Sequence, residues 1–298
     1  ALRGDVAKRG AQWQGTLATL RVAPTTGAAW ALRAPAAFSA TPGTAGLRLR
    51  IASSCFATDD GAGSLCADVD WPTRVDIKGE SLPLALLSPY LAAGEDAQRK
   101  RRDQWRLRGT VDLDARVRPV GGSWAGTAQL RSAEGGLALD ARSRRDVLAY
   151  SNLRLDARFD PRGMEAQLAS ALRDDGRVSA DVSAGWDAYA PLRGEIDADI
   201  RNLVWLELFS PDIVEPRGRL AGRIALGGTR AQPTLGGQAR LTGFTAELPS
   251  LAISLRDGDA RMDAQPDGSA RIVGSVRSGE GVVRIDGSLG WMSDDTPL

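Results

Sequence analysis

The stretch Val283-Arg-Ile-Asp-Gly-Ser-Leu-Gly-Trp291 decides the fold class of this chain. Its apolar residues Val283, Ile285, Leu289 and Trp291 alternate with polar residues or glycine. Successive side chains of a β-strand point to opposite faces of a sheet, so this alternation predicts a strand with one apolar face. The same pattern recurs in residues 47–51, 111–117, 178–186 and 251–255. The sequence therefore predicts an all-β chain.

Turn signals separate these runs at the spacing of about ten residues that is typical of consecutive strands. Examples are Asp160-Pro-Arg-Gly163, Asp174-Asp-Gly176 and Gly121-Gly122. Two apolar segments, 81–91 and 203–213, break the alternation, and each contains a Ser-Pro pair. We predict a turn or two of helix in each, stopped by its proline, with a buried loop as the alternative.

An internal repeat organises the chain. A shift of 105 residues aligns residues 152–186 with 257–291 without a gap, and nine of the 35 positions are then identical. We therefore predict a β-groove segment at 1–80, a first repeat of a short helix plus strands at 81–191, and a second such repeat at 192–298. The chain begins with Ala1 and ends just after a strand-like run, so it is expected to be part of a longer protein.

Composition removes several classes of function. The 298 residues include no histidine and carry a net charge of +1. Histidine-based catalysis and His-ligated zinc are therefore excluded, and nothing indicates a nucleic-acid partner. The Gly-Gly pairs and acidic pairs lack phosphate-loop or metal-ligand spacing. We predict no catalytic residues, no metal and no cofactor: the protein is not expected to be an enzyme. No apolar stretch is long enough to span a bilayer, so any anchor is expected outside this chain.

The two cysteines, Cys55 and Cys66, flank a loop with Gly61 and Gly63 at its tip. Two strands joined by this loop could bring the sulfur atoms to bonding distance, and we favour a disulfide over two separate buried thiols. A disulfide implies an oxidising compartment such as the periplasm.

Many positions on the predicted apolar faces are small. Ala180, Ala184, Ala198, Gly222 and Gly287 are examples, and only 5% of the residues are aromatic. Such an interior leaves room for a long apolar ligand, and an acyl chain gains about 0.8 kcal/mol for each buried methylene. Packing by a neighbouring part of the array would explain the same pattern, and both interpretations stay open here.

Four motifs follow one another in the second half of the chain. They are Leu192–Ile200, Gly218–Thr229, Gln232–Gly237 and Gly279–Gly287, and the Ser-Pro segment at 203–213 lies between the first two. Their order and spacing resemble the repeat of the TamB family, the translocation and assembly module subunits within the AsmA-like bridge-like lipid transporters. The cysteine pair before Ala67–Trp71 is also similar to that family.

The resemblance implies an elongated single-layer β-sheet array folded into a taco-like groove, with short helices between repeats. It implies a periplasmic conduit that moves phospholipid from the inner to the outer membrane and supports outer-membrane assembly. The expected partners are phospholipid acyl chains and an outer-membrane barrel protein of the TamA type. This chain would be the periplasmic portion of an inner-membrane-anchored protein in a Gram-negative bacterium.

The alternative is a chaperone-like scaffold of the translocation and assembly module that helps insert outer-membrane proteins and autotransporters. In the conduit hypothesis, inward apolar residues of the second repeat line the lipid groove. These residues are Leu220, Ile224, Leu226, Leu251, Ile253, Leu255, Val283, Ile285, Leu289 and Trp291.

Overall fold

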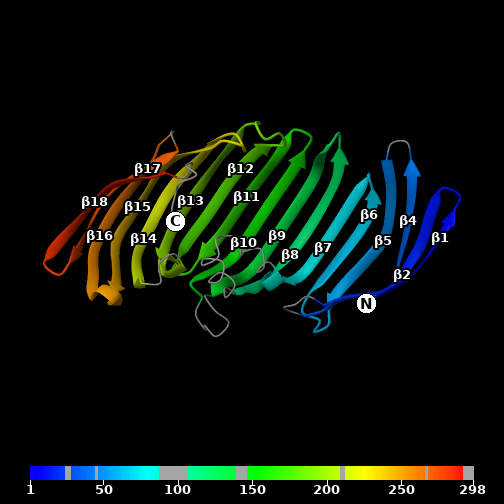
Figure 1. The fold of residues 1–298 in the computed structure, drawn as a ribbon, viewed down its shortest axis with the longest axis horizontal. Helices are drawn as coiled ribbons and strands as arrows, with labels where there is room; N and C mark the ends of the chain where they lie inside the picture. The colour runs from blue at the N-terminus through cyan, green and yellow to red at the C-terminus, as the bar shows by residue number, and fades with distance from the viewer. Residues whose placement is uncertain are drawn as a thin grey trace. The chain divides into compact units, whose positions relative to one another are not determined.

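The computed structural model describes residues 1–23, 28–43, 46–86, 106–138, 146–208, 212–265 and 268–290. Its 18 strands belong to one antiparallel sheet, and the described residues contain no α-helix (Figure 1). The predicted all-β fold is thereby confirmed. Contacts divide the chain into unit 1, Ala1–Gly135 with Arg154–Gly163, and unit 2, Gly136–Leu153 with Met164–Leu298. The segments 1–80, 81–191 and 192–298, which come from the sequence repeat, stay a prediction.

Unit 1 is a sheet in which most strands pair with their neighbours along the chain. Its strands are β1 (Leu2–Arg9), β2 (Gln12–Val22), β3 (Trp30–Leu32), β4 (Ala36–Gly43), β5 (Gly46–Thr58), β6 (Ser64–Trp71), β7 (Arg74–Pro83), β8 (Arg106–Val120) and the first part of β9 (Ser123–Ala138). The short strand β3 lies between β2 and β5 beside β4, so β2 pairs with both β3 and β4. The strand β10 (Leu148–Asp160) is divided between the two units.

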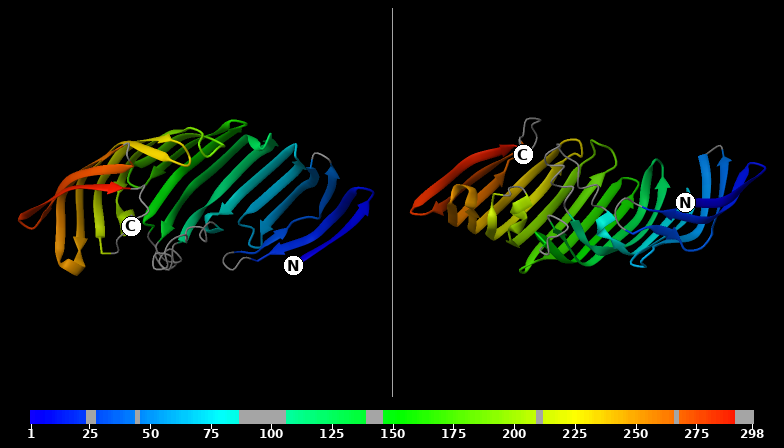
Figure 2. Two further views of the ribbon diagram at one scale, coloured as in Figure 1. Left: turned by 45° about the horizontal axis from the view of Figure 1, so that its top comes forward. Right: turned by 60° about the horizontal axis from the view of Figure 1, so that its bottom comes forward.

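Unit 2 continues with antiparallel strands that lie side by side in both views of Figure 2. Most are joined by short turns, whereas the longer connection between β13 and β14 contains a 3-10 helix. The strands are β11 (Gly163–Leu172), β12 (Gly176–Gly185), β13 (Leu192–Asn202), β14 (Val214–Gly228), β15 (Pro233–Leu248), β16 (Ile253–Ala264), β17 (Ser269–Ser278) and β18 (Gly281–Gly290). From β12 to β18, each strand pairs with the next strand of the sequence. The connections of this unit therefore join strands that pair with each other, as the turn signals predicted.

The two segments predicted as short helices each contain a 3-10 turn. β7 extends through the first of them to Pro83, and the 3-10 turn follows at residues 84–86. The second contains the 3-10 helix η2 (Val204–Leu208). The residues after these turns, 87–91 and 209–211, lie outside the described part of the chain. A 3-10 helix is the form that short helical pieces usually take at connections between other elements.

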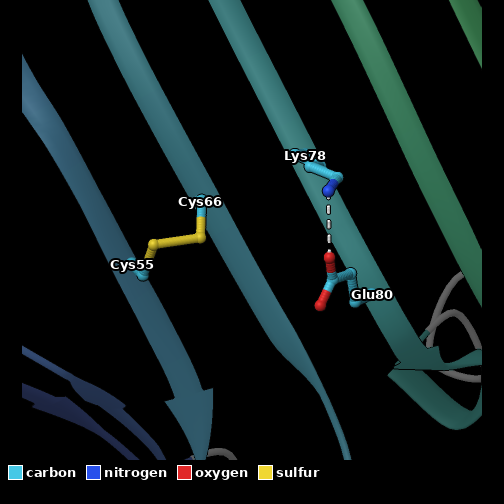
Figure 3. The surroundings of a disulfide bond; sticks show 4 residues. All are labelled: Cys55, Cys66, Lys78 and Glu80. Carbon is cyan, nitrogen blue, oxygen red and sulfur yellow. Dashed lines mark ion pairs between the residues drawn. A yellow bond between two sulfur atoms is a disulfide. The ribbon is translucent and has the colours of Figure 1, made fainter.

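The predicted disulfide is present (Figure 3). Cys55 on β5 lies directly opposite Cys66 on β6, and the Cα atoms are 4.0 Å apart. The two residues are direct partners in the strand register, so their side chains lie on the same face of the sheet. The disulfide therefore ties two neighbouring strands of unit 1 together at the level of Lys78 on β7.

Candidate functional site

One face of the unit 2 sheet consists almost entirely of apolar and small residues. Directly opposed residues of antiparallel strands carry their side chains on the same face, so the strand register defines rows that cross the sheet. One row runs through Ile200, Leu220, Leu241, Ala260, Gly274 and Ile285. A second row runs through Ala180, Ile196, Ile224, Gly237, Ala264, Ala270 and Leu289. We call the face formed by these rows the apolar face of unit 2.

The residues expected to line a groove can be placed on this face with three exceptions. Those on it are Leu220, Ile224 and Leu226 of β14, Ile253 and Leu255 of β16, and Val283 and Ile285 of β18. The strand register also places Leu289 on this face, although the structure does not describe its side chain. Trp291 lies outside the described residues.

The alternating pattern placed Leu251 in a strand, and this prediction is wrong. Leu251 lies in the 3-10 helix η3 (Pro249–Leu251), and 64% of its surface is exposed. Pro249 occupies the first turn of this helix, where its fixed φ and missing N–H are tolerated. The strand β16 begins only at Ile253.

The apolar face is partly open to solvent. Val283 and Ile285 on β18 are 50% and 45% exposed, whereas Ala270 and Val276 on β17 are buried. The exposed residues form apolar surface without a protein partner among the described residues, while the small side chains beside them are covered. Such surface is a candidate for binding an apolar ligand.

Near one end of β14, the start of the 3-10 helix η2 is tightly packed, and Leu203 just before it is one of the largest fully buried side chains. Leu203, just before η2, is 1% exposed, and Val204 is 4% exposed. Gly218 has a φ of +137°, and a Cβ atom there would stand 3.2 Å from the Cδ1 atom of Leu203. The glycine therefore allows η2 to pack closely against β14.

The opposite face of the unit 2 sheet carries charged side chains in ion pairs. Arg223 on β14 binds Asp197 on β13 at 3.0 Å, and Arg271 on β17 binds Asp286 on β18 at 3.2 Å. These pairs are exposed, so each contributes only about 0–1 kcal/mol to stability. Their main consequence is a strongly hydrated face, so apolar surface is concentrated on the other side of the sheet.

Asp199 differs from the other acids of this face because its side chain is only 7% exposed. The Arg219 guanidinium donates two hydrogen bonds to its carboxylate, at 2.8 and 2.9 Å. These bonds lower the pKa of Asp199 below its usual value, against the opposing effect of burial, and Arg201 and Arg177 add a smaller attraction. The bidentate pair ties β13 to β14.

We expect Asp199→Asn to destabilise the chain by about 2 kcal/mol, since it leaves a buried amide against an unpaired guanidinium that is partly solvated. The pKa of Asp199 is lowered in the folded state, so the pair stabilises the fold above the carboxyl's unfolded pKa of about 4. This contribution is lost as the pH falls through the lowered folded pKa. Urea unfolding at pH 7 and pH 3 checks both statements: the difference between wild type and variant should shrink at pH 3.

A similar two-faced arrangement exists in unit 1. One row of its apolar face runs through Gly15, Phe38, Ile51, Val69, Val75 and Val117. The disulfide lies on the opposite face, beside an open hollow of about 680 Å³. Charges of both signs line this hollow, and Arg74 is already paired with Asp68 and Asp76. The hollow thus offers no uniform charge with which to select a ligand.

Two further observations concern the described residues only. Their Cys, Asp and Glu side chains do not gather into a group of three or more that could hold a metal ion. Among their helical segments, none has the length and apolar character needed to cross a membrane.

Comparison with known proteins assigns the chain to a family. No curated protein and no solved structure matches it. The family model described as "TamB, N-terminal domain" matches residues 1–241, which is most of the chain and includes the strands from β1 to part of β15. Of the motifs that carry the sequence resemblance, Gly279–Gly287 lies beyond this match. The chain belongs to the TamB family.

Proposed function

We propose that this chain is a periplasmic lipid conduit whose apolar face holds the acyl chains of phospholipids on their way from the inner to the outer membrane. The family has a general role in translocation and assembly or in lipid transport, and is associated with the cell envelope. It is a transport and assembly family, not a known enzyme family, and it implies a partner of the TamA type in general.

The observation that supports the conduit is the apolar face of unit 2. The rows defined by Leu220 and Ile224 cross six or more neighbouring strands without a charged residue. An acyl chain laid along such rows would be covered by aliphatic side chains and gain about 0.8 kcal/mol per methylene. A scaffold that acts through its strand edges does not need an apolar face that continues across the interior strands.

Photocrosslinking in cells can test the conduit. A photoreactive amino acid replaces Ile224 on the apolar face, and its neighbour Ala225 on the opposite face provides the matched control. Both positions belong to β14, and neither side chain takes part in an ion pair. We expect phospholipid adducts, detected by mass spectrometry, at position 224 and not at position 225.

Other outcomes would count against the conduit. Equal adducts at both positions would mean that lipid does not distinguish the two faces of the sheet. Protein adducts without lipid at position 224 would instead favour the scaffold that helps insert outer-membrane proteins.

A further inference from the structure

We propose that one edge of unit 1 binds the phosphate headgroups of the transported lipids. The edge consists of the turns β1–β2, β6–β7 and β8–β9 with the strand ends beside them; we call it the tryptophan edge (Figure 1). The inference rests on the proposed function and deepens it, because it states how a lipid is oriented across the strands of unit 1: acyl chains on the apolar face of unit 1, headgroup at this edge.

Three tryptophans mark the tryptophan edge. Trp13 follows the β1–β2 turn, Trp71 precedes the β6–β7 turn, and Trp124 follows the β8–β9 turn. Trp13 and Trp71 belong to one row with Ala40 and Leu49, so they lie on the apolar face of unit 1. Trp124 packs edge-to-face against Trp71, with ring centroids 5.9 Å apart.

These tryptophans are partly exposed, as is typical of residues at a boundary between apolar and polar phases. Trp13 and Trp124 are 43% and 39% exposed. No described residue accepts a hydrogen bond from the indole N–H of Trp13, Trp71 or Trp124. Tryptophan collects at membrane–water interfaces because its ring is apolar and its N–H is a polar donor. A phosphate or ester oxygen at the tryptophan edge would supply the missing acceptors.

Basic side chains accompany the tryptophans. Lys8 lies opposite Trp13, and its Nζ is 5.5 Å from the centre of the indole ring, which places an ammonium group at the end of the apolar face. Arg9 and Arg118 are exposed near the same turns and have no ion-pair partner within the described ranges. Arginine and lysine are the side chains that bind phosphate most strongly.

The opposite edge of unit 1 has a different chemistry. Its β5–β6 turn carries Asp59 and Asp60, and near the end of β7 Glu80 is bound to Lys78 (Figure 3). Arg21, at the same end of β2, is already bound to Asp59. Carboxylates repel a phosphate, so Asp60 disfavours an anionic headgroup at this edge. At the tryptophan edge, the exposed Asp70 is outnumbered by the basic side chains of Lys8, Arg9 and Arg118, so charge complementarity favours that edge.

The test compares two exposed alanines in turns at opposite ends of the strands, Ala11 beside the β1–β2 turn and Ala62 in the β5–β6 turn. Ala11→Cys and Ala62→Cys are made separately in the whole chain and labelled with a fluorophore. The purified proteins then receive phospholipid with a nitroxide either on the headgroup or near the end of the acyl chain. We expect the headgroup nitroxide to quench the label at position 11 at least about twofold more than at position 62, because strands that rise about 3.3 Å per residue separate the two turns.

The outcomes separate this inference from the proposed function. Equal headgroup quenching at both positions, or stronger quenching at position 62, would overturn the tryptophan edge while leaving a lipid conduit in place. Absence of quenching by both lipids at both positions, with no lipid bound to the protein, would overturn the proposed function and this inference with it.

A second pair of variants tests the residues themselves. Trp13→Leu keeps an apolar side chain on the face but removes the indole donor and the contact with Lys8. Trp30→Leu makes the same change in β3, near the opposite edge. Trp13→Leu should reduce headgroup quenching at position 11 by about half or more, whereas Trp30→Leu should leave it unchanged. An equal loss in both variants would contradict a role for the tryptophan edge.

Discussion

Replacing Ile285 by Asp is expected to abolish most lipid binding while leaving the chain folded. Ile285 lies on the apolar face opposite Gly274 and is already 45% exposed, so the folded state loses little packing. A carboxylate at this position would have to be desolvated by an acyl chain lying against it, which is strongly unfavourable. Lipid carried by the purified chain, measured by native mass spectrometry, should fall by about tenfold, which corresponds to 1.4 kcal/mol.

The chain provides a matched control in Val273→Asp. Val273 lies on the neighbouring strand β17, is also 45% exposed, and faces the charged side between Arg261 and Asp286. The same charge at the same exposure should therefore leave lipid binding unchanged. If Ile285→Asp unfolds the chain and Val273→Asp does not, position 285 belongs to a packed core and the conduit hypothesis loses its support.

Removing the disulfide should have the largest effect on stability. The double variant Cys55→Ala, Cys66→Ala opens a loop with a sequence separation of 11 residues. Chain-entropy estimates give a loss of about 3 kcal/mol for a loop of this size. The variant should unfold at lower urea concentration than wild type, and a reductant should destabilise the wild type to the level of the variant without affecting the variant.

Hydrogen exchange can locate this effect within the molecule. Amides of β5 and β6 should lose protection in the double variant, whereas those of β14 and β15 in unit 2 serve as an internal control and should keep it. Equal loss in both pairs would mean that the disulfide acts on the whole chain and not on its own hairpin.

The alternation of apolar and polar residues was sufficient to predict the strands. β12 and β18 follow the alternating runs that begin at Val178 and Val283, and the disulfide was predicted from the loop between Cys55 and Cys66. These predictions succeeded because successive side chains of a strand point to opposite faces, so a strand with one apolar face shows apolar residues at every second position.

Other features depend on information that local patterns do not contain. The register between β15 and β16 shifts near Phe244. The register between β16 and β17 shifts between Arg256 and Asp259, where Asp257 has a φ of +49°. Alternation cannot show such bulges, because they arise from how neighbouring strands fit together. The spacing of Leu251 from Ile253 also fits a strand, so the alternating pattern assigned Leu251 to a strand although it belongs to a 3-10 turn.

The tryptophans show another limit of sequence analysis. Trp71 and Trp124 pack against each other although they lie far apart in the sequence. Their position at one edge, together with Trp13, became visible only when the turns were arranged in space. All three tryptophans lie within three residues of a turn, which the sequence could have indicated. Placing these turns at the same edge of the sheet requires the direction of each strand.

The pairing of each strand with the next one from β12 to β18 has a consequence for how this molecule can vary in length. A sheet built from sequential hairpins can gain or lose two strands at a turn, such as 229–232, without rewiring the pairs on either side. Natural selection could therefore adjust the reach of such a protein in steps of one hairpin, each about two strand widths or 10 Å. Envelopes of different thickness could then be matched by counting hairpins while every existing turn is kept.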